Sequence, residues 1–164
     1  MLIKELTQKD CRTILAQASI ARLGCSLNDQ PYVVPVCIAH ESDYVYILST
    51  PGQKIEWMRA NPKVCIQVDE TTDPFHWASI IAYGEFQELR QPQFADECAK
   101  ARKLLSKRSQ WWLTPLAERQ MKVDHDVIDA IFFRIRIESM TGLETQTEDT
   151  TWPKKLLYPL GNRQ

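Results

Sequence analysis

The sequence predicts a mainly β protein with a few helices, in which six short antiparallel strands form a small closed or split β-barrel. Apolar and polar residues alternate over short segments that end in turn residues. These segments do not alternate regularly with long helices, which argues against a doubly wound parallel sheet. The 164 residues contain no internal repeat, low-complexity tract or clear linker, so we expect a single domain over residues 1–164.

Six segments have the composition and periodicity of strands. They cover residues 20–27, 32–40, 44–49, 63–70, 77–90 and 130–139. The turn segments "NDQP" and "ESD" separate the first three, which we interpret as an antiparallel meander. Pro35 interrupts the second segment. Because proline has no N–H to donate, this position is expected at a sheet edge or at a local break.

Helical and irregular segments account for most of the remaining chain. Thr7 followed by Asp10 is typical of a helix start. Further helical patterns cover residues 53–61 and 94–109, with a weaker helix or turn at 111–121. The segment "TTDPFH" is predicted as a loop, and the tail from about residue 141 is expected to be irregular.

The composition limits the class of partner. Apolar residues make up 44% and charged residues 25%, and the net charge is −1, as is typical of a soluble globular protein. Such a charge gives no bulk attraction to nucleic acid or to an anionic membrane. The start "MLIKELTQKD" lacks the apolar core of a signal peptide, and no apolar run has the length of a membrane span. We therefore expect a cytoplasmic protein that binds neither nucleic acid nor membrane.

The cysteines and histidines give no pattern of a metal or nucleophilic site. Five cysteines without a C-x-x-C spacing, three of them in apolar runs, predict buried reduced thiols. Cys37 and His40 lie three apart on a predicted strand, so they point to opposite faces. His76 and His125 are more typical of surface or structural positions. We therefore expect no metal and assign no catalytic residue.

The stretch "STPGQKIEWMRANP" is the strongest local candidate for a ligand site. Free N–H groups at a helix start attract anions, Gly52 lets the backbone approach closely, and Lys54 adds a charge. The P-loop spacing is absent. These residues alone fit either a phosphate site or a helix start with an exposed lysine.

A basic cluster, comprising Arg102, Lys103, Lys107 and Arg108, lies in the third helical segment. It fits a solvated helix face, or else a surface for RNA or a partner protein.

One ordered set of segments goes beyond generic patterning. The order "A-R-L", "P-Y-V-V-P-V", a strand that ends in a small hydroxyl residue, "G-x-K", "N-P-x-V" and then "WASIIAYGEFQEL" resembles the flavin-binding split barrel of the pyridoxamine 5′-phosphate oxidase-like superfamily. Residues 10–143 resemble in particular its nitroimidazole-resistance-type branch. The resemblance implies a six-stranded antiparallel split β-barrel, a homodimer, and FMN in a groove at the subunit interface.

The resemblance also implies roles for individual residues. Ser49, Thr50 and Lys54 would hold the FMN phosphate, and Gln53 stands where relatives often carry arginine.

Two strands would lie along the rest of the cofactor. Val34, Pro35 and Val36 would run along the isoalloxazine ring, with backbone groups at its polar edge. Ser79 matches a polar position that reaches the flavin from a neighbouring strand.

Ile47 and Leu48 would lie under the ring and the ribityl chain. Leu48 stands where nitroimidazole-resistance-type relatives commonly carry histidine. The tail from Thr141 to Gln164 lacks the arginine-rich substrate motif of true pyridoxamine 5′-phosphate oxidases, so vitamin B6 oxidation is not expected.

The function that this resemblance implies is that of an FMN-dependent oxidoreductase acting on a small molecule. Two alternatives stay open: a flavin or haem carrier or sensor without turnover, and a degenerate barrel with an empty groove that serves as a dimeric partner module.

Overall fold

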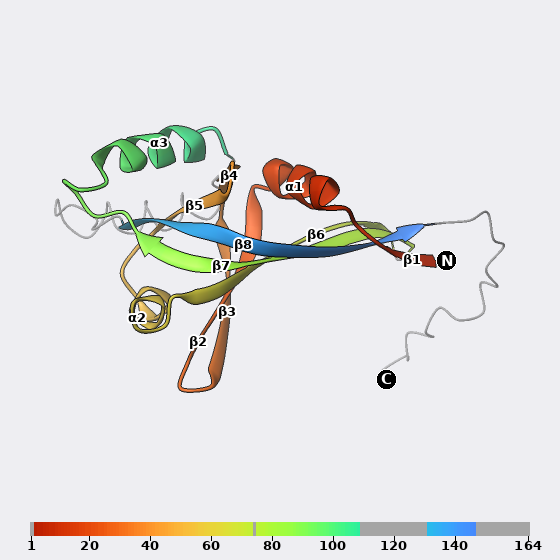
Figure 1. Ribbon diagram of the computed structural model, residues 1–164, viewed down its shortest axis with the longest axis horizontal. Helices are drawn as coiled ribbons and strands as arrows, with labels where there is room; N and C mark the ends of the chain where they lie inside the picture. Colours follow the sequence, from red (N-terminus) through yellow and green to blue (C-terminus); the bar gives the residue numbers. More distant parts are fainter. Residues whose placement is uncertain (1, 74, 109–130, 147–164) are drawn as a thin grey trace, which may run out of the picture.

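The computed structural model describes residues 2–73, 75–108 and 131–146. In chain order its elements are β1 (Leu2–Glu5), α1 (Gln8–Gln17), β2 (Ile20–Leu27), β3 (Gln30–Cys37), β4 (Ala39–Glu41), β5 (Tyr44–Ser49), α2 (Gln53–Ala60), β6 (Lys63–Asp73), β7 (His76–Glu88), α3 (Ala95–Leu105) and β8 (Ile131–Gln146) (Figure 1).

The described strands form one antiparallel sheet in the order β3-β2-β6-β7-β8-β5-β4, with β1 paired to β8. The sheet is open, and β3 comes close to β5 without pairing with it. The mainly β fold is therefore confirmed, but the strand count is eight rather than six. The prediction missed β1, and it joined β3 and β4, which the chain separates at Ile38.

The predicted meander is confirmed in part. β2 pairs with β3, and β4 pairs with β5 across the predicted "ESD" turn, but β3 does not pair with β5, whose other partner is β8. The meander in the structure is β6-β7-β8, because the long β8 supplies a partner edge to both β7 and β5. Pro35 lies on β3, at the end of the sheet order, as its missing N–H predicted.

The strand ends extend further than predicted at two places. β6 runs to Asp73 and β7 begins at His76, so the predicted loop at 71–76 is shorter. β8 continues to Gln146, so the tail is not irregular before that residue. The predicted segment 111–121 lies outside the described residues. The "NDQP" turn is confirmed, with Asn28 and Asp29 both at positive φ, as a two-residue hairpin turn requires.

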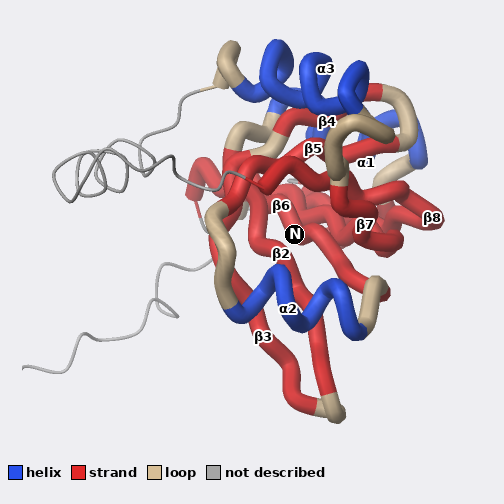
Figure 2. The backbone as a smooth tube through the Cα atoms, turned by 90° about the vertical axis from the view of Figure 1, so that its left-hand side faces the viewer, coloured by secondary structure: helices blue, strands red, loops and turns tan. Residues whose placement is uncertain are grey.

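The helices lie on two sides of the sheet. α1 and α3 lie on one side, and α2 lies on the other against the β2–β3 hairpin (Figures 1 and 2). Thr7 caps α1 as predicted, because its Oγ1 accepts a hydrogen bond from the Asp10 amide at 3.2 Å. In α2, the Trp57 ring packs on Tyr32 with the ring centroids 5.6 Å apart.

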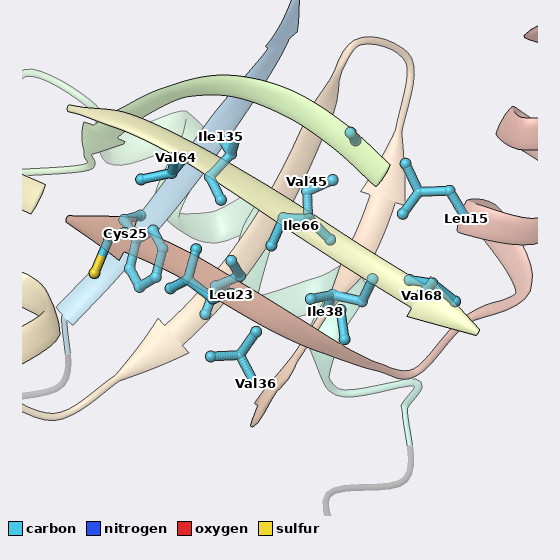
Figure 3. Packing of buried hydrophobic residues seen from close by; sticks show 14 of the residues in the cluster. Leu15, Leu23, Cys25, Val36, Ile38, Val45, Val64, Ile66, Val68 and Ile135 are labelled. Atoms are coloured by element: carbon cyan, nitrogen blue, oxygen red, sulfur yellow. The ribbon is translucent and has the colours of Figure 1, made fainter. Parts of the chain in front are cut away.

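Buried side chains fill the inside of the curved sheet. Leu23, Ile66 and Val45, from β2, β6 and β5, point toward one another in this core (Figure 3). A smaller cluster under α3 contains Tyr46, Leu89, Cys98 and Ala101. Four cysteines are buried and Cys65 is half-buried, close to the prediction. In the part of the chain that the structure describes, no helix is both long and apolar enough to cross a bilayer.

Candidate functional site

The turn from β5 into α2 combines the polar groups that the sequence singled out. The Gly52 carbonyl accepts hydrogen bonds from the amides of Ile55 and Glu56 at 3.0 and 3.2 Å. No side chain caps the start of α2. The first amides of the helix, at Gln53 and Lys54, therefore have no intrahelical acceptor and carry the positive end of the helix dipole.

Lys54 is the cation of this turn, and it is half-buried. Burial lowers the pKa of its ammonium group, while the nearby Cys25 opposes that effect. Among the described residues, no carboxylate forms an ion pair with Lys54. A charge that has lost water without gaining a counter-charge is unfavourable, and a bound anion would relieve that cost.

The space beside this turn is open. A Cβ added to Gly52 would meet no atom within 4 Å. Ser49 is buried and its hydroxyl donates to the Thr50 carbonyl at 2.9 Å, which fixes the start of the turn. Ile55, fully buried in the main core, holds the start of α2 in place. The structure thus brings Ser49, Thr50, Gln53 and Lys54 together.

The side chains of β3 point alternately to two faces of the sheet. Val36 is buried in the core and Val34 packs against it, whereas Pro35 is exposed on the outer face. The three side chains therefore cannot all contact one ligand. A ligand that lies along β3 would therefore meet the backbone edge of the strand rather than all three side chains.

β5 shows the same division. Ile47 is fully buried in the core, so its side chain does not line an open site. Leu48 points to the other face, beside its register partner Phe132 on β8. β4 pairs with β5 only at residues 44–46, so within the described chain one backbone edge of residues 47–49 has no strand partner. Strands β3 and β5 thus approach each other, and each has a backbone edge there that no other described strand pairs with.

Ser79 is not brought to the other predicted site residues. It lies on β7, where its Oγ accepts a hydrogen bond from Gln67 Nε2 at 3.2 Å. Gln67 also donates to Asp69, which pairs with Arg22. In the sheet order, β2 and β6 separate β7 from β3, and β8 separates it from β5.

The described histidines do not join this site. His40 lies on β4, where burial lowers the pKa of its imidazole and the Ser42 backbone opposes that effect. Its Nε2 is buried and has no hydrogen-bond partner among the described residues. His76 contacts the Asp73 carboxylate at 2.8 Å, and His125 lies outside the described residues. No group of potential metal ligands gathers within residues 2–73, 75–108 and 131–146.

The sequence did not indicate that Arg102 and Arg108 line a cavity beside Leu48. Their cluster was interpreted as a solvated face or as a surface for a large partner. Arg102, Lys103 and Lys107 are exposed, as that interpretation expects, and Arg108 is half-buried. Arg102 and Arg108 differ from the two lysines because they also line the cavity. The spacing of residues along one segment could not predict this cavity, because its walls come from β5, β8 and the α3 region together. Arg108 also lies beyond the end of α3, outside the helical pattern.

Comparison with known proteins identifies the family. A family model described as pyridoxamine 5′-phosphate oxidase matches residues 7–144. The chain belongs to this family. The split barrel that the sequence resembles and the open antiparallel sheet of the structure agree with that assignment.

Relatives of this pyridoxamine 5′-phosphate oxidase family member include proteins of similar length. An uncharacterized protein of Rhizobium meliloti is 36% identical over 147 residues, covering 87% of this chain and 95% of that protein. The crystal structure of a protein from Mesorhizobium loti, described as FAD-binding, is 35% identical with a TM-score of 0.74 and covers 89% of this chain and 100% of its own. A candidate 5-nitroimidazole antibiotic resistance protein from Bacteroides thetaiotaomicron shares the fold at 20% identity, with a TM-score of 0.63 and 88% and 89% coverage.

Proposed function

We propose that this protein binds FMN, with the phosphate at the start of α2, and acts as a flavin-dependent oxidoreductase on a small molecule. One observation carries the proposal: Lys54 is half-buried without a carboxylate partner among the described residues, beside a helix start that no side chain caps. A phosphate would supply the missing counter-charge and accept from the free amides. The FAD-binding description of the Mesorhizobium loti relative supports a flavin.

The residues present fit the cofactor. Lys54, the amide of Gln53 and the hydroxyl of Thr50 would hold the phosphate, while Gly52 leaves room for it. The unpaired backbone edges of β3 and β5 offer donors and acceptors to the polar edge of the ring. Leu48 supplies an apolar contact. The buried side chains of Val36 and Ile47 support these strands from inside rather than contact the ring.

The bound flavin would supply the chemistry, taking two electrons from a reduced donor and giving them to an oxidised acceptor. The chain would position the ring and keep water from one of its faces. No side chain at the site is assigned as a general acid or base, since Leu48 occupies the position of the histidine in nitroimidazole-resistance-type relatives. The alternative function is that of a flavin carrier without catalytic activity. In that case, stopped-flow measurements should show that NADH and NADPH do not reduce the bound flavin.

We also propose a homodimer in which the outer face of the sheet meets the second copy. Val33, Gly24, Cys65 and Tyr83 form one row across β3, β2, β6 and β7. Val33 and Tyr83 are 63% and 47% exposed, although both are largely apolar. Ser79 lies on this same face, so a partner copy would give it a route to the other subunit's flavin.

The dimer is tested by Tyr83→Glu, which places a charge in the centre of this face. Light scattering should report a dimer for the wild type and for a Lys9→Glu control on the exposed side of α1, and a monomer for Tyr83→Glu. An unchanged mass for Tyr83→Glu would remove this face from the interface.

The flavin proposal is tested first by the colour of the purified protein and by mass analysis of the cofactor it releases, expected to be FMN. Lys54→Ala should weaken FMN binding by about 1–3 kcal/mol, the size of a charge-assisted contact. The control Lys9→Ala, an exposed lysine on α1, should leave the dissociation constant unchanged. A colourless protein that FMN does not stabilise against heat would refute the proposal.

A further inference from the structure

A cavity of about 400 Å³ lies beside β5, on the side that faces α3. Its lining residues are Leu48, Arg102, Leu105, Ser106, Arg108 and Phe132. Leu48 and Phe132 are register partners on β5 and β8, so they share one face of the sheet. α3 lies over β4 and β5 at this face (Figure 2). The volume is within the usual range for small-molecule sites.

Two guanidinium groups contribute positive charge to this cavity. Among the described residues, neither Arg102 nor Arg108 forms an ion pair with a carboxylate. Most other described arginines do, since carboxylates pair with Arg12, Arg22, Arg59, Arg90 and Arg136. Within the described residues, the cavity therefore keeps two positive charges that no paired carboxylate neutralises.

The two arginines are held differently. The Arg102 guanidinium lies over the Phe132 ring, 5.2 Å from its centroid, a cation–π contact that does not engage its N–H groups with another polar residue. Arg108 donates to the α1 carbonyls of Ala16 at 2.8 Å and Gln17 at 3.5 Å. Those bonds fix Arg108 but leave its charge in place. Arg102 is therefore the better anchor for an anion, and Arg108 adds to the local potential.

The remaining walls favour an apolar ligand body. Leu48, Leu105 and the Phe132 ring supply apolar surface, while the Ser106 hydroxyl is already used in a bond to the Lys103 carbonyl. An inorganic anion would leave this surface in contact with water. A molecule with one carboxylate and an apolar body would satisfy both parts, because the planar guanidinium fork matches a carboxylate.

We infer that this cavity binds the carboxylate and apolar body of an organic acid, and that this acid is the substrate of the flavin. The second part rests on the proposed function, which puts Leu48 against the ribityl chain and ring. Leu48 then forms a wall common to cofactor and substrate, and the substrate lies on the α3 side of β5. Lys54 does not line this cavity, so the two cationic sites are separate.

The inference is tested with benzoate as the probe, by calorimetry on the full-length protein as purified. Benzoate should bind, and benzamide, its neutral analogue, should bind much more weakly. Arg102→Gln should weaken benzoate binding roughly ten- to a hundredfold, the effect of losing a charged hydrogen-bonding partner. Lys103→Gln removes the same charge from the next position of α3 without touching the cavity and should have little effect. Arg102→Lys should recover only part of the affinity.

Two results would contradict the inferred organic-acid site or its preference for a carboxylate. Benzoate that does not bind, or that binds Arg102→Gln and wild type equally, overturns the inference. Inorganic phosphate that displaces benzoate at lower concentration overturns the carboxylate assignment. Thermal unfolding of Arg102→Gln at the wild-type temperature shows that the variant is folded.

The cofactor is measured separately, so the two proposals fail independently. FMN affinity should be unchanged in Arg102→Gln and lowered in Lys54→Ala. Benzoate affinity should be lowered in Arg102→Gln and unchanged in Lys54→Ala. If the protein binds no flavin but binds benzoate through Arg102, the proposed function and the substrate role are refuted. The organic-acid site itself then still stands. If the protein does bind FMN, benzoate should also shift the flavin absorbance of the wild type, and an unshifted spectrum would refute the placement beside the ring.

Discussion

Two positively charged regions lie near β5 and differ in their surroundings. At the start of α2, a single half-buried lysine lies beside backbone amides that no side chain caps. At the end of α3, two arginines border a cavity with apolar walls, and the guanidinium of Arg102 lies over the Phe132 ring. The charge has the same sign in both regions, but amides with a point charge suit a phosphate and a planar fork over apolar walls suits a carboxylate.

The two regions are also anchored differently. α2 inserts Ile55 and Met58 into the main core and is tied at its other end by Arg59. α3 rests on the smaller cluster with Cys98 and Ala101. The comparison therefore predicts that α2 is anchored more firmly than α3, and it places a desolvated charge at Lys54. Three changes test these points in order of expected effect.

The largest effect is expected from truncating the core anchor of α2. Ile55→Ala should lower the free energy of unfolding by about 2–5 kcal/mol, because a fully buried side chain leaves a cavity in a packed core. Leu105→Ala, the matched change in α3, should lower it by only about 1–3 kcal/mol, since Leu105 already borders a cavity. Urea denaturation measures both. Equal losses would show that the two helices are anchored alike.

The next effect concerns the ion pair that ties α2 to the end of β7. Arg59 donates to both carboxylate oxygens of Glu88 at 2.8 Å, and Arg90 adds a third bond at 3.0 Å. The Arg59 hydrogen bonds are the main cause that lowers the pKa of Glu88 to about 2. Glu88→Gln should cost about 1–3 kcal/mol at pH 7, discounted for the partial exposure of Arg59.

The pH dependence of that effect follows from its sign. Because the folded pKa lies below the unfolded value of 4.5, the stabilisation is complete above pH 4.5 and disappears as the pH falls toward 2. The stability difference between wild type and Glu88→Gln, measured from pH 7 to pH 2, should therefore shrink below pH 4.5. A constant difference would mean that Glu88 contributes through packing and not through its charge.

The smallest effect concerns Lys54 in the protein without ligand. Lys54→Met should raise the free energy of unfolding by up to about 1 kcal/mol, because it removes a desolvated charge that lacks a counter-charge. Burial lowers the folded pKa of Lys54, so wild type gains stability as the pH rises through that pKa toward 10.5, and the advantage of Met should shrink there. A loss of stability at neutral pH in thermal unfolding would show that Lys54 has a favourable partner in the folded chain.

Much of the fold could be predicted from the sequence, because it depends on local patterns. The alternation in residues 20–27 and 44–49 gave the bounds of β2 and β5 directly. Asn28 and Asp29 gave the hairpin turn, and Pro35 gave an edge strand. The strand β1 was missed, since its four residues are all exposed and show no periodicity.

Some residues of the candidate site could likewise be placed from the sequence, and others could not. Ser49, Thr50, Gln53 and Lys54 are neighbours in the chain, so one turn was enough to bring them together. Ser79 could not be placed from the sequence, because its distance from β3 and β5 depends on the sheet order. The faces of Val36 and Ile47 follow from alternation, but which face is the inside depends on how the sheet curves.

The sequence by itself determined the family, most of the strands and the polar turn before α2, since each depends on residues close together in the chain. The tertiary structure alone decided that β5 pairs with β8, that Lys54 loses water, and that Arg102 and Arg108 meet Leu48 and Phe132 around one cavity. Burial and cavities arise from packing between segments far apart in the chain, and no local periodicity encodes that packing.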